Sequence, residues 1–365
     1  MKGGDAVNRS VRIRAAAMVS LLAIIAGPGC GDQCEIYGNC PSGGRDAWDG
    51  DDGASAGDVE TGFPWDLAPA GDQASETPSG LYPPGASPEQ VRALNAVNEV
   101  RAVVGVPPVN EVAPLNAAAQ SHADFIVNHC QDYADSGVSV HMEVPDWDGF
   151  TGQGPWDRAA HFGYESMNVS EVIAFVNNPE GAVRTWIDSL YHRLLVLEPG
   201  AKDMGYGLAR GKEPCSMPLY RLADVIDMGL GAVQGDPVAL YPPDGATDVP
   251  VAFQGFESPQ PPPPPGGYPS GYIVTVQFGK KLGFKVISHH LLDETGAEVD
   301  HLFLAPYADP EADVVKDPNA IGGDNYVAMY ANQPLDFGVT YTVRIEFDRG
   351  GKQLDLTWSF TTENP

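Results

Sequence analysis

The sequence WIDSLYHR, residues 186–193, combines a helix signal with a reactive side chain. It closes a segment, 180–190, in which apolar residues recur every three or four positions, the spacing of a buried helix face. It then places the imidazole of His192 directly after that predicted helix. Two more polar residues, His141 and Glu165, lie upstream in distinctive surroundings. If the fold brings these three side chains into one cleft, they can bind a polar ligand or a divalent cation such as zinc.

The surrounding chain predicts helices packed on a short antiparallel sheet. Ser87 precedes Pro88 and is followed by Gln90, which forms a capping box with proline at the first helical position. Apolar residues then recur at helical spacing up to Gly105, where this helix is expected to stop. The other expected elements are helices over 114–130 and 180–190, a loop over 137–163, and strands over 204–209 and 219–227. This order predicts an α+β domain built from helix, sheet and helix layers.

From residue 236 onward the sequence changes to short β-type runs separated by turn residues. The runs are 249–253, 272–278, 284–292, 326–330, 340–347 and 354–361. Such spacing predicts an all-β sandwich. A proline-rich insert, 258–269, is expected to be an extended loop. His289 and His290 are adjacent in one run, so strand alternation places them on opposite faces and argues against a joint site.

The N-terminus has the pattern of an export signal. Basic residues precede an apolar run, 15–26, that is too short to span a bilayer. Small residues then lead into Cys30 as in a bacterial lipobox, so Cys30 is expected to be lipidated, with plain secretion as the alternative. Residues 31–83 contain eleven acidic residues against one arginine, a composition typical of a disordered linker. The predicted organisation is a signal peptide over 1–30, an acidic linker over 31–83, and domains over 84–234 and 235–365.

The cysteines fit an exported protein. The chain has five, and four remain if Cys30 carries lipid. Disulfides persist outside the cytoplasm, and four cysteines allow three pairings. Cys34–Cys40 with Cys130–Cys215 is the most economical pairing because each bond stays within one segment.

Charge excludes several partners. The formal net charge is -28, from 49 acidic and 21 basic residues. Such a surface repels nucleic acid and anionic lipid headgroups, so neither is expected as a partner. Contact with a membrane is expected only through the N-terminal lipid.

Several motifs over residues 88–230 resemble the CAP superfamily, which includes cysteine-rich secretory proteins, antigen 5 and plant pathogenesis-related proteins. The opening helix matches the family's N-x-x-R-x-x-x-G-x-x-P pattern from Asn98 to Pro108. The segment 182–193 resembles its Trp-x-x-Ser-x-x-His-Arg motif. The remaining matches are 118–123, 157–164 and 204–207. The resemblance implies a three-layer α/β/α fold with a cavity that holds two histidines and two acidic residues.

Carried onto this chain, the resemblance assigns His141 and His192 to the two histidine positions. Glu165 matches the glutamate of the family's Gly-Glu-Asn motif, here Tyr164-Glu165-Ser166. The second acidic residue has no clear match, although Asp188 lies nearby in sequence. Some members of the family bind divalent cations in this cavity and others bind lipids or sterols, so both are candidate ligands.

Other polar residues of this region are expected to be structural. His122 falls on the inner side of the second predicted helix, where a hydrogen-bonded core histidine is more common than a ligand. His129 is expected to cap the end of that helix. Arg158 is expected to anchor a loop through a salt bridge.

The C-terminal part resembles bacterial Ig-like or fibronectin-type modules, in which Tyr341 would anchor a tyrosine corner. The first functional hypothesis is therefore a non-enzymatic CAP-domain protein of the bacterial envelope or extracellular space. It would bind a small ligand in the His/Glu cleft and contact an envelope or extracellular protein through its Ig-like module. The alternatives are a metal-assisted hydrolase that uses the same cleft, although HExxH is absent, and an adhesive surface protein with a vestigial cleft.

Overall fold

The computed structural model describes residues 81–280, 283–321 and 323–365. The predicted signal peptide, the lipidation of Cys30, the acidic linker and the Cys34–Cys40 pair lie outside these residues. No helix in the described ranges is long and apolar enough to cross a membrane.

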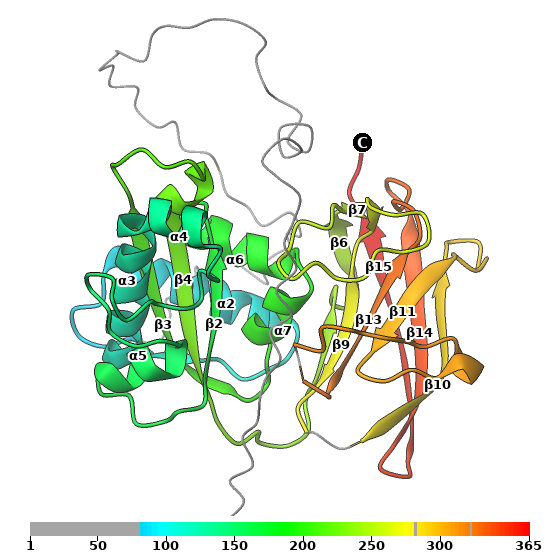
Figure 1. Cartoon of the computed structure of the whole chain (residues 1–365). Coiled ribbons are helices and arrows are strands. Elements are labelled where there is room, and N and C mark those ends of the chain that lie inside the picture. Colours follow the sequence, from blue (N-terminus) through cyan, green and yellow to red (C-terminus); the bar gives the residue numbers. More distant parts are fainter. Residues whose placement is uncertain (1–80, 281–282, 322) are drawn as a thin grey trace, which may run out of the picture. The chain divides into compact units, whose positions relative to one another are not determined.

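The first described part is an α/β domain with one mixed sheet (Figure 1). Its strands lie in the order β1-β3-β4-β2, with β1 parallel to β3 and the other pairs antiparallel. The helices are α2 (Pro88–Val103), α3 (Ala113–Asn128), α4 (Cys130–Ser136), α5 (Pro155–His161), α6 (Pro179–Ile187) and α7 (Tyr191–Val196). The strands are β1 (Asn110–Glu111), β2 (Val169–Ala174), β3 (Ala201–Arg210) and β4 (Leu222–Leu230), with a short 3-10 helix at Pro218–Arg221.

The start of α2 confirms the predicted capping box. The Ser87 hydroxyl accepts a hydrogen bond from the Gln90 backbone at 3.2 Å, and the Gln90 side chain accepts one from the Ser87 backbone at 2.8 Å. Two of the amides that a helix start leaves without partners are thereby satisfied. The helix ends before Gly105, whose φ of 73° suits glycine.

Alternating residues of the central strand β4 separate the two helical layers. Ala223 and Val225 pack with α3, whereas Ile226 and Met228 join a cluster with α2 and α6. This arrangement confirms the predicted helix, sheet and helix layers.

Two glycines of β3 allow α3 to lie directly on the sheet. A Cβ atom at Gly205 would lie 2.0 Å from the backbone of Leu115, and one at Gly207 would lie 2.3 Å from the backbone of Ala119. Contacts this short are impossible, so both positions must lack a side chain.

The structure differs from the sequence expectation in several places. The helix predicted over 114–130 is divided into α3 and α4 because His129 leaves helical geometry, with φ of -106°. The predicted loop over 137–163 contains α5, which begins at Pro155. Strand β2 and helix α7 were not predicted, and both carry residues of the site described below.

The C-terminal part consists of β-strands in several sheets. One sheet has the order β10-β14-β15-β6, a second has the order β12-β11-β13-β9-β5, and β7 pairs with β8. The strands are β5 (Val238–Tyr241), β6 (Ala246–Val249), β7 (Ala252–Phe253), β8 (Ser270–Gly271), β9 (Val274–Phe278), β10 (Phe284–Leu292), β11 (His301–Ala305), β12 (Val315–Lys316), β13 (Tyr326–Ala331), β14 (Thr340–Arg349) and β15 (Gln353–Thr362).

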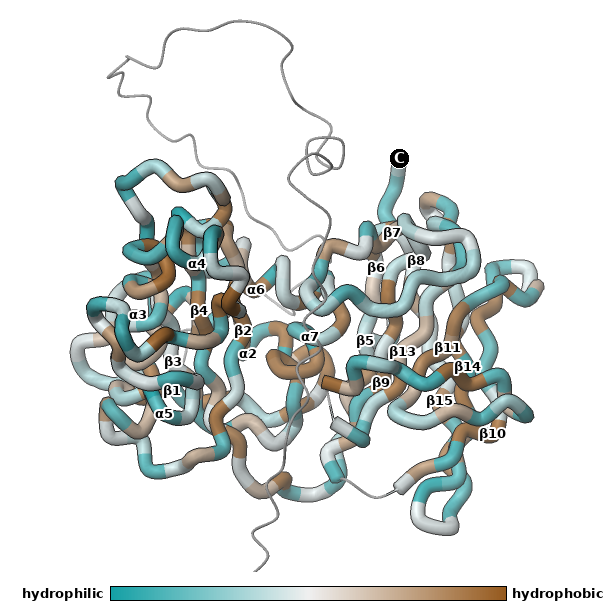
Figure 2. Tube along the Cα trace, in the orientation of Figure 1, coloured by the Kyte–Doolittle hydropathy of each residue, from teal (hydrophilic) through white to brown (hydrophobic). Residues whose placement is uncertain are grey.

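The two larger sheets share one apolar core. Val343, Ile345 and Phe347 of β14 belong to the same buried cluster as Val276 of β9 and Met329 of β13. Figure 2 shows hydrophobic segments along these strands and more hydrophilic connections between them. The proline-rich insert lies between β7 and β8 and contains no helix or strand, as expected. The all-β prediction is thus confirmed, and the Ig-like assignment remains a prediction.

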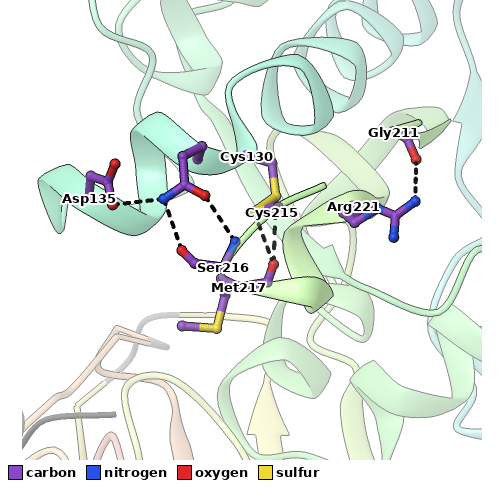
Figure 3. Close-up of a disulfide and its surroundings, with 8 residues drawn as sticks. Cys130, Asp135, Gly211, Cys215, Ser216, Met217 and Arg221 are labelled. Carbon is purple, nitrogen blue, oxygen red and sulfur yellow. Dashed lines mark hydrogen bonds between the residues drawn. A yellow bond between two sulfur atoms is a disulfide. The ribbon is translucent and has the colours of Figure 1, made fainter. Parts of the chain in front are cut away.

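A disulfide joins Cys130 at the start of α4 to Cys215, 85 residues further along the chain (Figure 3). Around it, the Gln131 side chain bonds to Ser216 through both the backbone and the hydroxyl, at 3.0 and 2.9 Å. This bond confirms one of the two predicted pairs, and it ties the loop between β3 and β4 to the helical layer.

Candidate functional site

His141 is held by a buried carboxylate from the central sheet. Its Nδ1 lies 2.8 Å from Oε1 of Glu171 in strand β2. The Glu171 side chain is 1% exposed, whereas that of His141 is 37% exposed. No described residue forms a hydrogen bond to Nε2 of His141. The carboxylate therefore fixes the ring through one nitrogen and leaves the other for a ligand.

Arg158 of α5 supports the same carboxylate. Its guanidinium donates to Oε2 of Glu171 at 2.5 Å and to the His141 backbone carbonyl at 3.2 Å. Its side chain is fully buried. The predicted salt bridge is thus confirmed, and its anchoring role includes the candidate site, because Arg158 contacts both members of the His141–Glu171 pair.

His122 of α3 lies behind this pair, in the core as predicted. Its Nε2 contacts the Val140 carbonyl at 2.8 Å, and its Nδ1 contacts Glu143 at 3.1 Å. Glu143 also accepts hydrogen bonds from the backbone of Thr151 and Gly152. These bonds fix the segment that carries His141, so His122 is a positioning residue rather than an exposed ligand.

Asp227 completes the buried cluster from the neighbouring strand. It faces Glu171 in the register of the β2–β4 pair, and its side chain is fully buried. Burial and the negative charge of Glu171 raise the pKa of Asp227 well above its usual value. Both effects favour the protonated form of Asp227 over the charged form.

Glu171 keeps its charge despite its position. Burial raises its pKa, but the guanidinium of Arg158 and the two histidines outweigh burial, so the pKa lies below its usual value. The pKa of Glu143 also lies below its usual value, because burial raises it by less than its neighbours lower it, chiefly through hydrogen bonds from His122 and Thr151. The site therefore contains two ionised carboxylates beside one arginine and two imidazoles.

The structure gives Glu165 a different place from the one expected. Glu165 is exposed in the loop between α5 and β2. Within the described part of the chain, no hydrogen bond or ion pair joins it to His141 or His192. The carboxylate beside His141 is Glu171, in Ser170-Glu171-Val172. The signal for it was a lone acidic residue inside a run of β-branched residues, VSEVIAFV, which has the composition of a buried strand.

His192 has a carboxylate partner of its own, from the C-terminal part of the chain. Its Nδ1 lies 2.7 Å from Oε1 of Glu257, in the loop after β7. Glu257 also accepts the backbone N–H groups of Leu190, Tyr191 and His192 at 2.7–3.0 Å. Its side chain is fully buried. The same carboxylate thus both binds the first turn of α7 and orients the His192 ring.

The neighbours of His192 also contact the C-terminal part. The buried Arg193 donates to the Ile273 carbonyl at 2.6 Å and lies over the Tyr241 ring at 4.4 Å from its centroid. Tyr191 donates to Asp317 at 2.8 Å. The motif that suggested a cavity wall therefore forms a polar and aromatic interface with the β-strand region. Asp188, the nearby acidic residue, accepts from Tyr272 at 2.7 Å instead of facing His192.

The candidate residues thus form two separate histidine–carboxylate pairs. His141 pairs with Glu171 and His192 pairs with Glu257, and no hydrogen bond or ion pair among the described residues joins one pair to the other. The described residues also contain no group of three or more His, Cys, Asp or Glu side chains arranged to hold a metal ion. Metal binding by His141 and His192 together remains a prediction that this geometry does not support.

The fold and motif order define an α/β/α domain followed by an all-β region. Residues 94–217 match the model of the CAP, cysteine-rich secretory protein family, so this segment is a CAP domain. No protein of the curated set matches the chain. Among solved structures, an outer surface protein of Borrelia burgdorferi is similar, with 13% identity over 38% of this chain and 89% of that chain and a TM-score of 0.28.

Proposed function

We propose that this chain is an exported protein whose CAP domain binds a small ligand at His141 without catalysing a reaction. The observation that carries the proposal is the Glu171–His141 pair, in which a buried carboxylate orients a partly exposed imidazole. Such a pair presents Nε2 of the imidazole to a cation or to a hydrogen-bond donor.

Two observations favour binding over hydrolysis. The hydroxyl next to His141 is that of Ser139, which accepts from the His141 backbone at 3.4 Å and does not contact its ring. Ser189 contacts His192 at 3.1 Å, but it donates to the Trp186 carbonyl at 3.0 Å. A serine nucleophile activated by histidine must donate its hydroxyl hydrogen to the ring, whereas Ser189 donates to the Trp186 carbonyl.

Export is supported by the Cys130–Cys215 disulfide, because such bonds persist in oxidising compartments. The apolar N-terminal run leading to Cys30 supports a lipid anchor in the bacterial envelope.

The C-terminal region has two roles in this proposal. It orients His192 through Glu257, and its free surface contacts an envelope or extracellular protein. An Ig-like module is supported by Tyr341, whose hydroxyl accepts the Asp336 backbone N–H at 2.9 Å in the manner of a tyrosine corner.

Two probes test the binding site. Zinc chloride and detergent-solubilised cholesterol are titrated into the full chain by calorimetry, as representatives of the two ligand classes. His141→Ala is expected to weaken binding of one probe at least ten-fold, whereas His161→Ala, a change at an exposed histidine of α5, leaves it unchanged. Equal binding of both probes by wild type and His141→Ala contradicts the proposal. Ester turnover that is lost in His141→Ala would favour the hydrolase alternative.

A further inference from the structure

Two histidines from different sheets of the C-terminal region face each other. Nδ1 of His289 in β10 lies 2.8 Å from Nε2 of His301 in β11. The two strands belong to different sheets, so the contact links the layers of the β-region. His290, the next residue, contacts Glu298 at 3.0 Å and is not part of the His289–His301 contact. The predicted separation of His289 from His290 is confirmed, and His289 instead pairs with His301.

The outer nitrogen of each ring is already committed as a donor. Nε2 of His289 lies 2.9 Å from the Ala312 carbonyl, and Nδ1 of His301 lies 2.7 Å from the Val299 carbonyl. A carbonyl oxygen only accepts, so each of these nitrogens carries the hydrogen of its ring. In two neutral rings, the two nitrogens that face each other therefore both present lone pairs. Contact at 2.8 Å requires a positively charged species between them.

A proton or a metal ion can supply that charge. Two nitrogens bound to one tetrahedral zinc ion at about 2.05 Å each lie about 3.3 Å apart. The observed separation needs to grow by only about half an ångström to reach that value.

The surroundings of the pair are those of histidine ligands in metal sites. Such ligands generally donate their second ring nitrogen to a backbone carbonyl or carboxylate, and both rings do so here. The His289 ring also stacks on Phe303, with centroids 4.1 Å apart, which fixes its plane. Asp313 acts electrostatically on His289 and adds negative charge near the pair. Both rings are partly exposed, so water can complete the coordination.

We propose that His289 and His301 bind a divalent transition-metal ion such as zinc, through Nδ1 of the first and Nε2 of the second. Two waters complete a tetrahedral arrangement. The ion joins β10 to β11 and thereby links the two sheets. The proposal is independent of the site at His141, because the two sites share no residue.

Zinc titration into the full chain at pH 7.5 tests this site. His289→Gln and His301→Gln are each expected to remove one zinc equivalent, or to weaken its binding at least ten-fold. His290→Gln is the matched control, since it alters the adjacent exposed histidine, and both it and His141→Ala are expected to retain this equivalent. Zinc binding that is the same in wild type, His289→Gln and His301→Gln overturns the proposal.

A measurement on the wild-type protein covers the case in which a variant fails to fold. Nitrogen-15 NMR of the histidine side chains follows each ring during the zinc titration. The facing nitrogens of His289 and His301 are expected to shift together at one equivalent. Ring resonances of both residues that do not move at saturating zinc overturn the proposal.

Discussion

Replacing Glu257 with glutamine removes the negative charge that the C-terminal region places at the first turn of α7. The native carboxylate accepts hydrogen bonds from three backbone N–H groups and from the His192 ring, all within 3.0 Å. Its side chain is fully buried, so water cannot replace these bonds. Glutamine has nearly the same shape but only one acceptor oxygen. The amide nitrogen of glutamine cannot accept a hydrogen bond. It must therefore face either the Leu190 N–H, which Oε2 of Glu257 binds, or the three donors that Oε1 binds: the Tyr191 N–H, the His192 N–H and the His192 ring.

The expected loss of stability follows from these contacts. A hydrogen bond to a charged group contributes about 1.5–3 kcal/mol, and removing one partner of a buried ionic pair costs about 3–5 kcal/mol. Glutamine retains part of the hydrogen bonding, so we expect Glu257→Gln to lower the free energy of unfolding by about 2–4 kcal/mol. Glu294→Gln is the matched control, because Glu294 is exposed in a hairpin turn, and it is expected to change stability by less than about 0.5 kcal/mol.

Urea denaturation followed by circular dichroism measures both variants. A double-mutant cycle with His192→Gln isolates the interaction between the two side chains, for which we expect at least about 1 kcal/mol of coupling. A loss below about 0.5 kcal/mol in Glu257→Gln would refute the reasoning, since a buried carboxylate with four donors cannot be removed without cost. Additive effects of the two substitutions would show that the ring and the carboxylate do not interact.

Three other predictions concern the CAP domain. Asp227 has a raised pKa in the folded state, so it destabilises the protein at pH values above its unfolded pKa of about 4. Asp227→Asn should therefore be more stable than wild type at pH 7 by about 1–3 kcal/mol. Urea titrations should show that this difference vanishes below about pH 4. Burial also raises the pKa of Asp224, but Asp224 accepts three backbone N–H groups and the Tyr206 hydroxyl, and an amide cannot keep all of these bonds. Asp224→Asn should therefore destabilise the protein, and equal responses of the two variants would contradict the assignment. Reduction of Cys130–Cys215, which spans 85 residues, should lower stability by up to about 4–5 kcal/mol in denaturation with and without reductant, and no change would show that the bond does not constrain the unfolded chain. Ser87→Ala should cost about 1 kcal/mol by thermal denaturation through loss of the capping box, whereas an unchanged midpoint would assign the helix start to packing alone.

Features set by local sequence were the most predictable. The capping box at Ser87 depends on residues within one helical turn, and the structure contains it. The layered fold follows from apolar periodicity and from motifs whose order resembles a known family. The pairing of Cys130 with Cys215 belonged to the most economical of the three pairings that four cysteines allow, and the structure confirms it.

Features that depend on distant contacts were not predictable in the same way. Glu171 lies on a strand whose six residues all partner β4; the apolar run around it indicates a buried strand, but it does not indicate which side chain Glu171 contacts. Glu257 is 65 residues beyond His192 and belongs to another part of the chain. Periodicity identifies which residues are buried, but it does not identify which buried side chains contact each other. The two histidine–carboxylate pairs therefore could not be predicted from the sequence and are defined by the structure.

The two glycines of β3 beneath α3 have a consequence for natural variation. Even alanine at Gly205 or Gly207 would push the whole helix outward, and His122 would move with it away from Glu143. The substitution would then disturb the surroundings of His141, although β3 contributes no side chain to the His141–Glu171 pair. Among homologues that keep the same polar cluster, we expect both positions to tolerate no other amino acid, and a relative with a bulkier residue there should also have lost His141.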